Sequence, residues 1–224
     1  MRIAVPIAAS VTLVFLAACA SAPVSVDQPI CDPRPGEWTA LEKGNVSFLT
    51  GTIAFDGLPG WVDKQQPPVT VLACSDSRVP PELVFHQGVD RLFIVRSAGN
   101  VADTFGIASI EYAIANNWTK LLVVLAHEKC GAVEAAIQSA SPTKDLKALV
   151  MKIRQSFTGP DCTLADPACW PRRTIQNAQH AVTDLKRRSP LIRRAIDHCK
   201  LPVVVAHYDV NGKVTVLQYI NFEK

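Results

Sequence analysis

Two short segments of the chain gather side chains that bind metals and activate water. The sequence Cys-Ser-Asp-Ser-Arg occupies residues 74–78, and His-Glu-Lys-Cys occupies residues 127–130. Two thiolates and an imidazole suit Zn²⁺, and three protein ligands leave the fourth tetrahedral position open for water. These residue types therefore indicate a catalytic zinc site formed by Cys74, His127 and Cys130. The competing interpretation is that both cysteines are inert core thiols beside a core histidine.

Asp76 has two alternative roles beside this cluster. As a fourth metal ligand it would close the site, whereas as a partner of Arg78 it would leave the metal open and accept a hydrogen bond from the bound hydroxide. The planar guanidinium of Arg78 suits a bidentate pair that keeps the carboxylate ionised and oriented. A third interpretation is that Asp76 only caps the next helix.

Strand-length apolar runs come directly before both clusters and predict how they are positioned. These runs alternate with helix-like stretches, which predicts an α/β fold with one domain and a mainly parallel central β-sheet flanked by helices. The carboxyl ends of parallel strands meet at one edge of a sheet, so the two clusters are expected to face one another. The predicted strands cover Val69–Ala73, Leu92–Val95, Leu121–Ala126 and Pro202–Ala206, and the predicted helices cover Glu37–Gly51, Asp103–Asn116 and Gly131–Ser139.

Two further segments have recognisable roles in this fold. Asn211-Gly212 lies between apolar residues near the carboxyl terminus, which predicts a tight turn in an edge hairpin. Residues 158–171 contain Gly159, Pro160, Pro167 and Pro171, so they are predicted to form a loop.

The motifs around the clusters resemble the β class of carbonic anhydrases. The resemblance extends from about Leu41 to Val214, with Ala126 standing where a glycine commonly precedes the ligand histidine. It rests on the segments Cys-Ser-Asp-Ser-Arg-Val-Pro-Pro-Glu (74–82), Leu-Phe-Ile-Val-Arg-Ser-Ala-Gly-Asn (92–100), Ile-Glu-Tyr-Ala (110–113) and His-Glu-Lys-Cys-Gly-Ala (127–132).

The resemblance implies a zinc-dependent carbonate dehydratase with one Zn²⁺ per subunit. Cys74, His127 and Cys130 would hold the metal, and zinc-bound hydroxide would attack carbon dioxide to give bicarbonate and a proton, with Asp76 and Arg78 as the catalytic pair. The partners it implies are carbon dioxide and bicarbonate, and a second subunit in a homodimer or larger even assembly. The substrate pocket, shared between subunits, would include Gln65, Phe93, Ala98, Tyr112 and the backbone N–H of Gly131.

Two other functions remain open at this point. The same zinc hydroxide could hydrolyse a related small molecule such as carbonyl sulfide or carbon disulfide. Alternatively, the chain is a non-catalytic zinc-binding lipoprotein, in which the metal has no coordination position open to water.

The amino terminus indicates export. Residues 1–18 combine Arg2, an apolar stretch and small residues, which is typical of a signal peptide. Leu-Ala-Ala-Cys at residues 16–19 resembles a bacterial lipoprotein box, so Cys19 is predicted to carry the lipid anchor, residues 19–36 to form a tether and residues 37–224 the catalytic domain. The predicted location is the periplasmic face of a membrane, and Ala20 in place of aspartate favours the outer membrane.

Composition and cysteine count agree with this organisation. The 224 residues are 48% hydrophobic and 19% charged with a net charge of +3, which suits one globular domain and argues against a protein that coats nucleic acid. Of seven cysteines, one is assigned to lipid and two to zinc. The remaining four are disulfide candidates, with Cys162–Cys169 closing a short loop and Cys31–Cys199 left as the second pair, although three connectivities are formally open.

Overall fold

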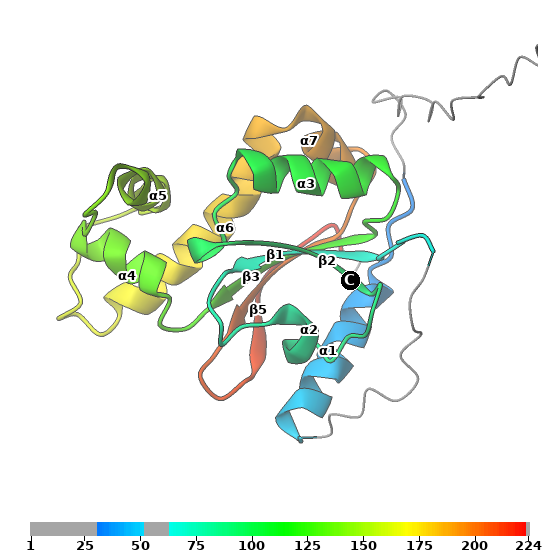
Figure 1. Ribbon diagram of the computed structural model, residues 1–224, viewed down its shortest axis with the longest axis horizontal. Coiled ribbons are helices and arrows are strands. Elements are labelled where there is room, and N and C mark those ends of the chain that lie inside the picture. Colours follow the sequence, from blue (N-terminus) through cyan, green and yellow to red (C-terminus); the bar gives the residue numbers. More distant parts are fainter. Residues whose placement is uncertain (1–30, 52–62, 223–224) are drawn as a thin grey trace, which may run out of the picture.

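A five-stranded sheet with helices on both faces forms the core of the molecule (Figure 1). The computed structural model describes residues 31–51 and 63–222, so the predicted signal peptide, Cys19 and most of the predicted tether lie outside the described residues. The strand order is β2-β1-β3-β4-β5, and only β4–β5 is antiparallel. The strands are β1 (Val69–Cys74), β2 (Leu92–Ser97), β3 (Leu121–His127), β4 (Val203–Tyr208) and β5 (Val214–Ile220). The predicted α/β class and the hairpin at Asn211-Gly212 are confirmed.

The helices pack in two layers and one end group. In Figure 1, α3 and α7 lie above the sheet, α1 and α2 lie below it, and α4 and α5 lie beyond one end. Long helix α6 runs from that end group along the upper face. The helices are α1 (Gly36–Leu49), α2 (Pro81–Val84), the 3₁₀ turn η1 (Ala98–Asn100), α3 (Thr104–Ala115), α4 (Gly131–Gln138), α5 (Lys144–Arg154), α6 (Cys169–Arg188) and α7 (Pro190–Asp197).

The central strands β1 and β3 are buried along their whole length. Their side chains alternate between two cores: Leu72 and Val124 pack toward α3, α6 and α7, whereas Val71 and Val123 pack toward α1 and α2. A parallel sheet covered on both faces requires such continuous apolar runs. This is why the strands that carry the candidate ligands were recognisable from sequence.

Helix α1 approaches the backbone at the end of α2 closely. A Cβ on Gly44 would lie 1.7 Å from the carbonyl oxygen of Phe85, so only glycine fits there. The next residue, Asn45, is buried and donates from Nδ2 to the carbonyls of Val84 and Gly212, at 2.9 Å each. Its Oδ1 accepts from the N–H of Val214 at 3.0 Å. One asparagine therefore links α1 to α2 and to the β4–β5 hairpin.

The prediction of a loop over residues 158–171 is wrong at its carboxyl end, because α6 begins at Cys169. Pro171 favoured the loop, yet proline is tolerated in the first helical turn, where its missing N–H would have no helical partner.

Two disulfides fasten the described chain. Cys162 pairs with Cys169 across a separation of 7 residues, and Cys31 pairs with Cys199 across 168. Residues at the end of the predicted tether also contact the domain, since the Arg34 N–H donates to the carbonyl of Lys120. In the part of the chain described here, no helix is long and apolar enough to cross a bilayer.

Candidate metal centre

The ends of two central strands and the start of one helix bring the predicted ligands together. Cys74 is the last residue of β1, His127 is the last residue of β3, and Cys130 precedes the first residue of α4. All three are buried, and one ligand atom from each lies within 4.8 Å of the others. The pairing of Ala73 with Leu125 sets the register that puts both strand ends at the same edge.

The two sulfur atoms lie 3.9 Å apart, so their ionisation is linked. The hydrogen bond with Cys130 is the main cause that lowers the pKa of Cys74, and the N–H of Gly99 contributes from 3.2 Å. The same interaction and burial raise the pKa of Cys130. The two sulfurs therefore oppose each other's ionisation, and a divalent cation would allow both to be thiolates.

His127 is oriented for metal binding. Its Nδ1 lies 2.9 Å from the carbonyl oxygen of Glu128, which can only accept, so Nδ1 carries the proton. With Nδ1 donating to this carbonyl, Nε2 is the ring atom left to bind a metal, and this buried atom has no hydrogen-bond partner among the described residues. An unpartnered buried acceptor beside two sulfurs fits a metal ion, and the N,S,S donor set fits zinc.

Asp76 is paired with Arg78 at the edge of this cluster. Arg78 Nε donates to Oδ1 at 2.9 Å and Nη2 to Oδ2 at 2.6 Å, while the Arg78 N–H also donates to Oδ1 at 2.9 Å. These bonds hold the pKa of Asp76 well below its usual range. Oδ2 lies 3.9 Å from Nε2 of His127, so of the two alternative roles the described arrangement is the one in which Asp76 faces Arg78.

Two of the five predicted pocket positions lie at this edge of the sheet. Ala98 is in η1, directly after β2, and Gly131 begins α4. A Cβ on Gly131 would meet no heavy atom within 4 Å, so the space in front of this backbone is open.

The other three predicted pocket residues lie elsewhere in the same chain. Phe93 pairs with Thr70 near the amino ends of β2 and β1, the end opposite Cys74. Its ring packs against Tyr112 with 6.5 Å between centroids. Tyr112 and Gln65 line a cleft of about 760 Å³ at that end. One copy of the chain therefore does not bring Gln65, Phe93 and Tyr112 to the metal ligands.

Sequence reasoning assigned no role to several residues that support the centre. Arg96 donates from Nε to the carbonyl of Cys74 at 2.9 Å and from Nη2 to the carbonyl of Asp76 at 2.7 Å. Gly99, with φ of +67°, turns its N–H toward the Cys74 sulfur. Both residues lie in the segment 92–100 that carried the resemblance, but their spacing alone gave no signal of these contacts.

Comparison with known proteins agrees with the motifs. The family model described as carbonic anhydrase matches residues 69–214. A carbonic anhydrase of Mycolicibacterium smegmatis is 31% identical over 192 residues, which cover 82% of this chain and 93% of that protein.

Solved structures share the fold. A β-carbonic anhydrase of Aspergillus fumigatus superimposes with a TM-score of 0.60 at 24% identity, covering 84% of this chain and 88% of that one. One of two β-carbonic anhydrases from Sordaria macrospora, described as tetrameric, gives a TM-score of 0.55 at 22% identity, with coverages of 81% and 90%. At these identities the likeness concerns the fold.

Proposed function

Because the chain belongs to the carbonic anhydrase family, we propose that it hydrates carbon dioxide reversibly at the centre formed by Cys74, His127 and Cys130. The enzyme class is carbonate dehydratase, and the products of hydration are bicarbonate and a proton. The observation that carries the proposal is the buried Nε2 of His127, which lacks a partner among the described residues and lies beside two sulfur atoms.

Zinc is the proposed metal, one ion per subunit, held by these three side chains. When bound, zinc supplies the Lewis acid that makes water nucleophilic near neutral pH. The backbone carbonyl of Glu128 fixes the ring of His127, and the N–H of Gly99 faces the sulfur of Cys74. These contacts pre-organise the ligands before any metal arrives.

Asp76 and Gly131 are the proposed groups around the reacting molecules. Arg78 holds the ionised carboxylate of Asp76 in place, so that it accepts a hydrogen bond from the attacking water and orients it. The N–H of Gly131 lies at the start of α4 next to open space, where a helix amino terminus stabilises negative charge. We expect the developing bicarbonate to lie against this backbone, with Ala98 as part of the wall.

A second copy of the chain is the proposed source of the remaining pocket wall. Gln65, Phe93 and Tyr112 lie at the opposite end of the sheet from the ligands of their own chain, and Tyr112 is 53% exposed. Contact with a partner would bury this aromatic surface and complete the pocket in a homodimer or larger even assembly. Sedimentation velocity should give an even oligomer, and Tyr112→Arg should reduce assembly and activity together. A fully active monomer would refute this part of the proposal.

Export as a lipoprotein anchored through Cys19 is also proposed, with the domain at the periplasmic face of a membrane and the outer membrane favoured by Ala20. The leader sequence and the two disulfides support it, because disulfides persist in oxidising compartments. Mass spectrometry of membrane-purified protein should find a mature chain that begins at acylated Cys19. An unmodified Cys19 in a chain that retains Met1 would overturn it.

The central test is the rate of carbon dioxide hydration, measured by rapid mixing on zinc-loaded protein. The wild type should accelerate the reaction strongly, Asp76→Asn should be slower, and Cys74→Ser should be inactive. Circular dichroism of each variant separates loss of chemistry from loss of fold. A wild-type rate no higher than that of Cys74→Ser would refute the proposed activity.

A further inference from the structure

Helix α6 reaches the backbone of one proposed metal ligand through Trp170. The indole Nε1 donates to the carbonyl oxygen of Cys130 at 3.2 Å, and the ring packs against the apolar cluster that contains both ligand cysteines. The same carbonyl accepts the N–H of Glu134 in the first turn of α4. Trp170 therefore holds the point where the chain leaves Cys130 and enters α4.

The same helix supports the other sulfur through Asn177. Its Nδ2 donates to the carbonyl of Gly99 at 2.7 Å, and the N–H of Gly99 donates to the Cys74 sulfur at 3.2 Å. Asn177 is 6% exposed, so water does not offer its amide an alternative partner. Trp170 and Asn177 are seven positions apart on one face of α6. Trp170 binds the backbone of Cys130, and Asn177 binds Gly99, whose N–H contacts the sulfur of Cys74. Each residue thus supports a different sulfur atom.

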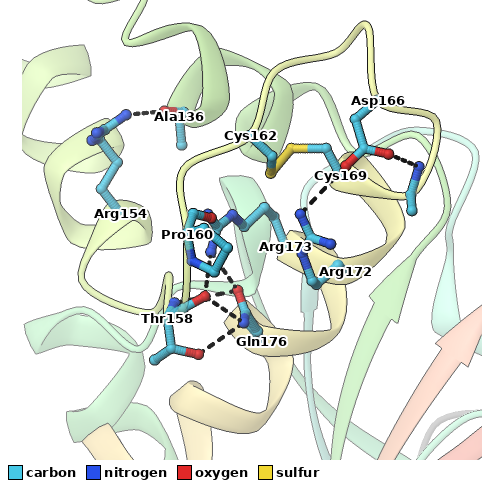
Figure 2. Close-up of a disulfide and its surroundings, with 11 residues drawn as sticks. Ala136, Arg154, Thr158, Pro160, Cys162, Asp166, Cys169, Arg172, Arg173 and Gln176 are labelled. Carbon is cyan, nitrogen blue, oxygen red and sulfur yellow. Dashed lines mark hydrogen bonds and ion pairs between the residues drawn. A yellow bond between two sulfur atoms is a disulfide. The ribbon is translucent and has the colours of Figure 1, made fainter.

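The first turn of α6 is fastened to the preceding loop. Cys162 and Cys169 close that loop (Figure 2). The residue that follows Cys169 in sequence is Trp170. Buried Arg173 donates to the carbonyls of Thr158 and Pro160 at 2.8 and 2.7 Å, as Figure 2 shows. Its guanidinium also lies over the ring of Phe157, 4.8 Å from the centroid. The loop and the start of the helix therefore form one cross-linked unit.

We propose that Trp170 and Asn177 are positioning residues for the two metal-binding sulfurs, and that the Cys162–Cys169 disulfide fixes Trp170 in this role. The physical reason is that groups hydrogen-bonded behind metal ligands restrict the ligands to the geometry that binds. Cys169 of the disulfide is directly adjacent to Trp170 in sequence but about two helical turns from Asn177, so loss of the disulfide should loosen the Cys130 side more than the Cys74 side. The inference rests on the proposed metal site.

Two substitutions test the positioning role. Trp170→Phe keeps the ring and removes the N–H donor, and Asn177→Leu keeps the approximate size and removes the amide. Each should weaken zinc binding about 10-fold or more, since such partners typically contribute 10–100-fold to metal affinity. Arg172→Gln is the matched control, because Arg172 lies in the same turn but pairs only loosely with exposed Asp166, at 3.5 Å.

The measurements are zinc affinity by chelator competition and the absorption spectrum of the Co²⁺-substituted protein. Thiolate-to-cobalt bands report ligand geometry directly, so they should shift in Trp170→Phe and Asn177→Leu but not in Arg172→Gln. If both variants keep the wild-type spectrum and a zinc affinity within twofold, the positioning role is wrong. These readouts do not require activity, so a failure here is distinct from a failure of carbon dioxide hydration.

The disulfide is tested by comparing two double variants. Cys162→Ser/Cys169→Ser should weaken zinc binding and alter the cobalt spectrum, whereas Cys31→Ser/Cys199→Ser should leave both unchanged even though it removes the bridge across 168 residues. When Cys162→Ser/Cys169→Ser is combined with Trp170→Phe, the loss of zinc-binding free energy should be smaller than the sum of the two separate losses, because both changes act on the same contact. Equal effects of the two double variants on the spectrum would overturn the link between this disulfide and Trp170.

Discussion

Asp76 is fixed as much by its local backbone as by charge. The Arg78 N–H and side chain both bind its carboxylate, and Arg96 holds the carbonyls of Cys74 and Asp76. The strand end, the turn and the two arginines therefore form one rigid edge beside the ligands. Loss of either arginine should disturb the position of the carboxylate before it disturbs its ionisation.

Arg78→Ala should reduce carbon dioxide hydration by about 10- to 100-fold, in the range typical of lost outer-shell partners. Arg78 lowers the pKa of Asp76, so the variant carboxyl moves toward its ordinary pKa, which still leaves it ionised above pH 6. The fold reduction in the hydration rate should therefore be similar at every pH from 6 to 9. Arg78→Lys should restore only part of the wild-type rate.

Stopped-flow rates with zinc content measured on the same samples provide the check. Arg193→Ala, at an exposed position on α7, is the control and should be unchanged. A variant rate within twofold of wild type would show that the Arg78 pair does not contribute.

The grouping of Cys74, His127 and Cys130 could be predicted from sequence because the two segments that carry them each follow a strand-length apolar run. The residues behind these ligands could not, since the contacts of Gly99, Trp170 and Asn177 depend on where α6 packs. A tryptophan, a glycine or an asparagine in isolation occurs in too many settings to reveal such a contact.

At the level of elements, neighbouring helices are joined by a few specific approaches. Helix α1 touches α2 so closely that Gly44 has no room for a side chain. Helix α6 is joined to α5 by Asp184, which is buried and pairs with Lys152 on α5 and with Arg187. Each approach gives a substitution whose effect should be confined to stability.

Gly44→Ala should lower the free energy of unfolding by about 1–3 kcal/mol or more, because its Cβ would overlap the Phe85 carbonyl. Gly36→Ala in the same helix is the matched control, since no heavy atom lies within 4 Å of the new Cβ. It should be neutral or slightly stabilising, by at most about 1 kcal/mol. Urea denaturation of both variants is the measurement, and equal stabilities would contradict the close approach.

Asp184→Asn should destabilise the domain by about 2 kcal/mol near neutral pH, the size expected for hydrogen bonds to a charged group. Burial alone would raise the pKa of Asp184, but the bonds with Arg187 and Lys152 outweigh it and lower the pKa. A lowered pKa in the folded state adds stability that is complete above the unfolded value of about 4 and is lost as the pH falls below it.

The difference between Asp184→Asn and wild type should therefore shrink on acidification from pH 5 to pH 3. Thermal unfolding at several pH values measures this trend. Asp145→Asn, the same change at an exposed position on α5, is the control and should differ only slightly in stability from wild type. If the stability of Asp184→Asn instead fell further below that of wild type on acidification, the direction of the pKa shift assigned to Asp184 would be wrong.

For the molecule as a whole, sequence patterns were sufficient for the sheet and insufficient for the helices between α4 and β4. The apolar runs predicted four parallel strands with small errors at their ends, because a doubly covered sheet leaves an unambiguous pattern. Helices α5, α6 and α7 were not assigned, and in α6 Pro171 and the charged residues of 186–188 obscure the periodicity. The pocket was also beyond prediction from a single chain, as three of its expected residues lie at the far end of the sheet.

The two disulfides should differ in their contribution to stability. In the chain-entropy account, a bridge across 168 residues adds about 5 kcal/mol and one across 7 residues adds about 2 kcal/mol. Cys31→Ser/Cys199→Ser should therefore be the less stable double variant in urea. A lower stability for Cys162→Ser/Cys169→Ser would mean that local packing, not chain entropy, decides the contribution.

The long bridge has another consequence, for a molecule that meets proteases. Cys31 and Cys199 enclose most of the described chain, so a single cut at any peptide bond between them leaves two fragments joined covalently. Such a nicked molecule keeps its mass apart from one added water and runs as two pieces only after reduction. Comparing protease-treated samples on reducing and non-reducing gels would thus reveal cleavage that an intact-looking band conceals.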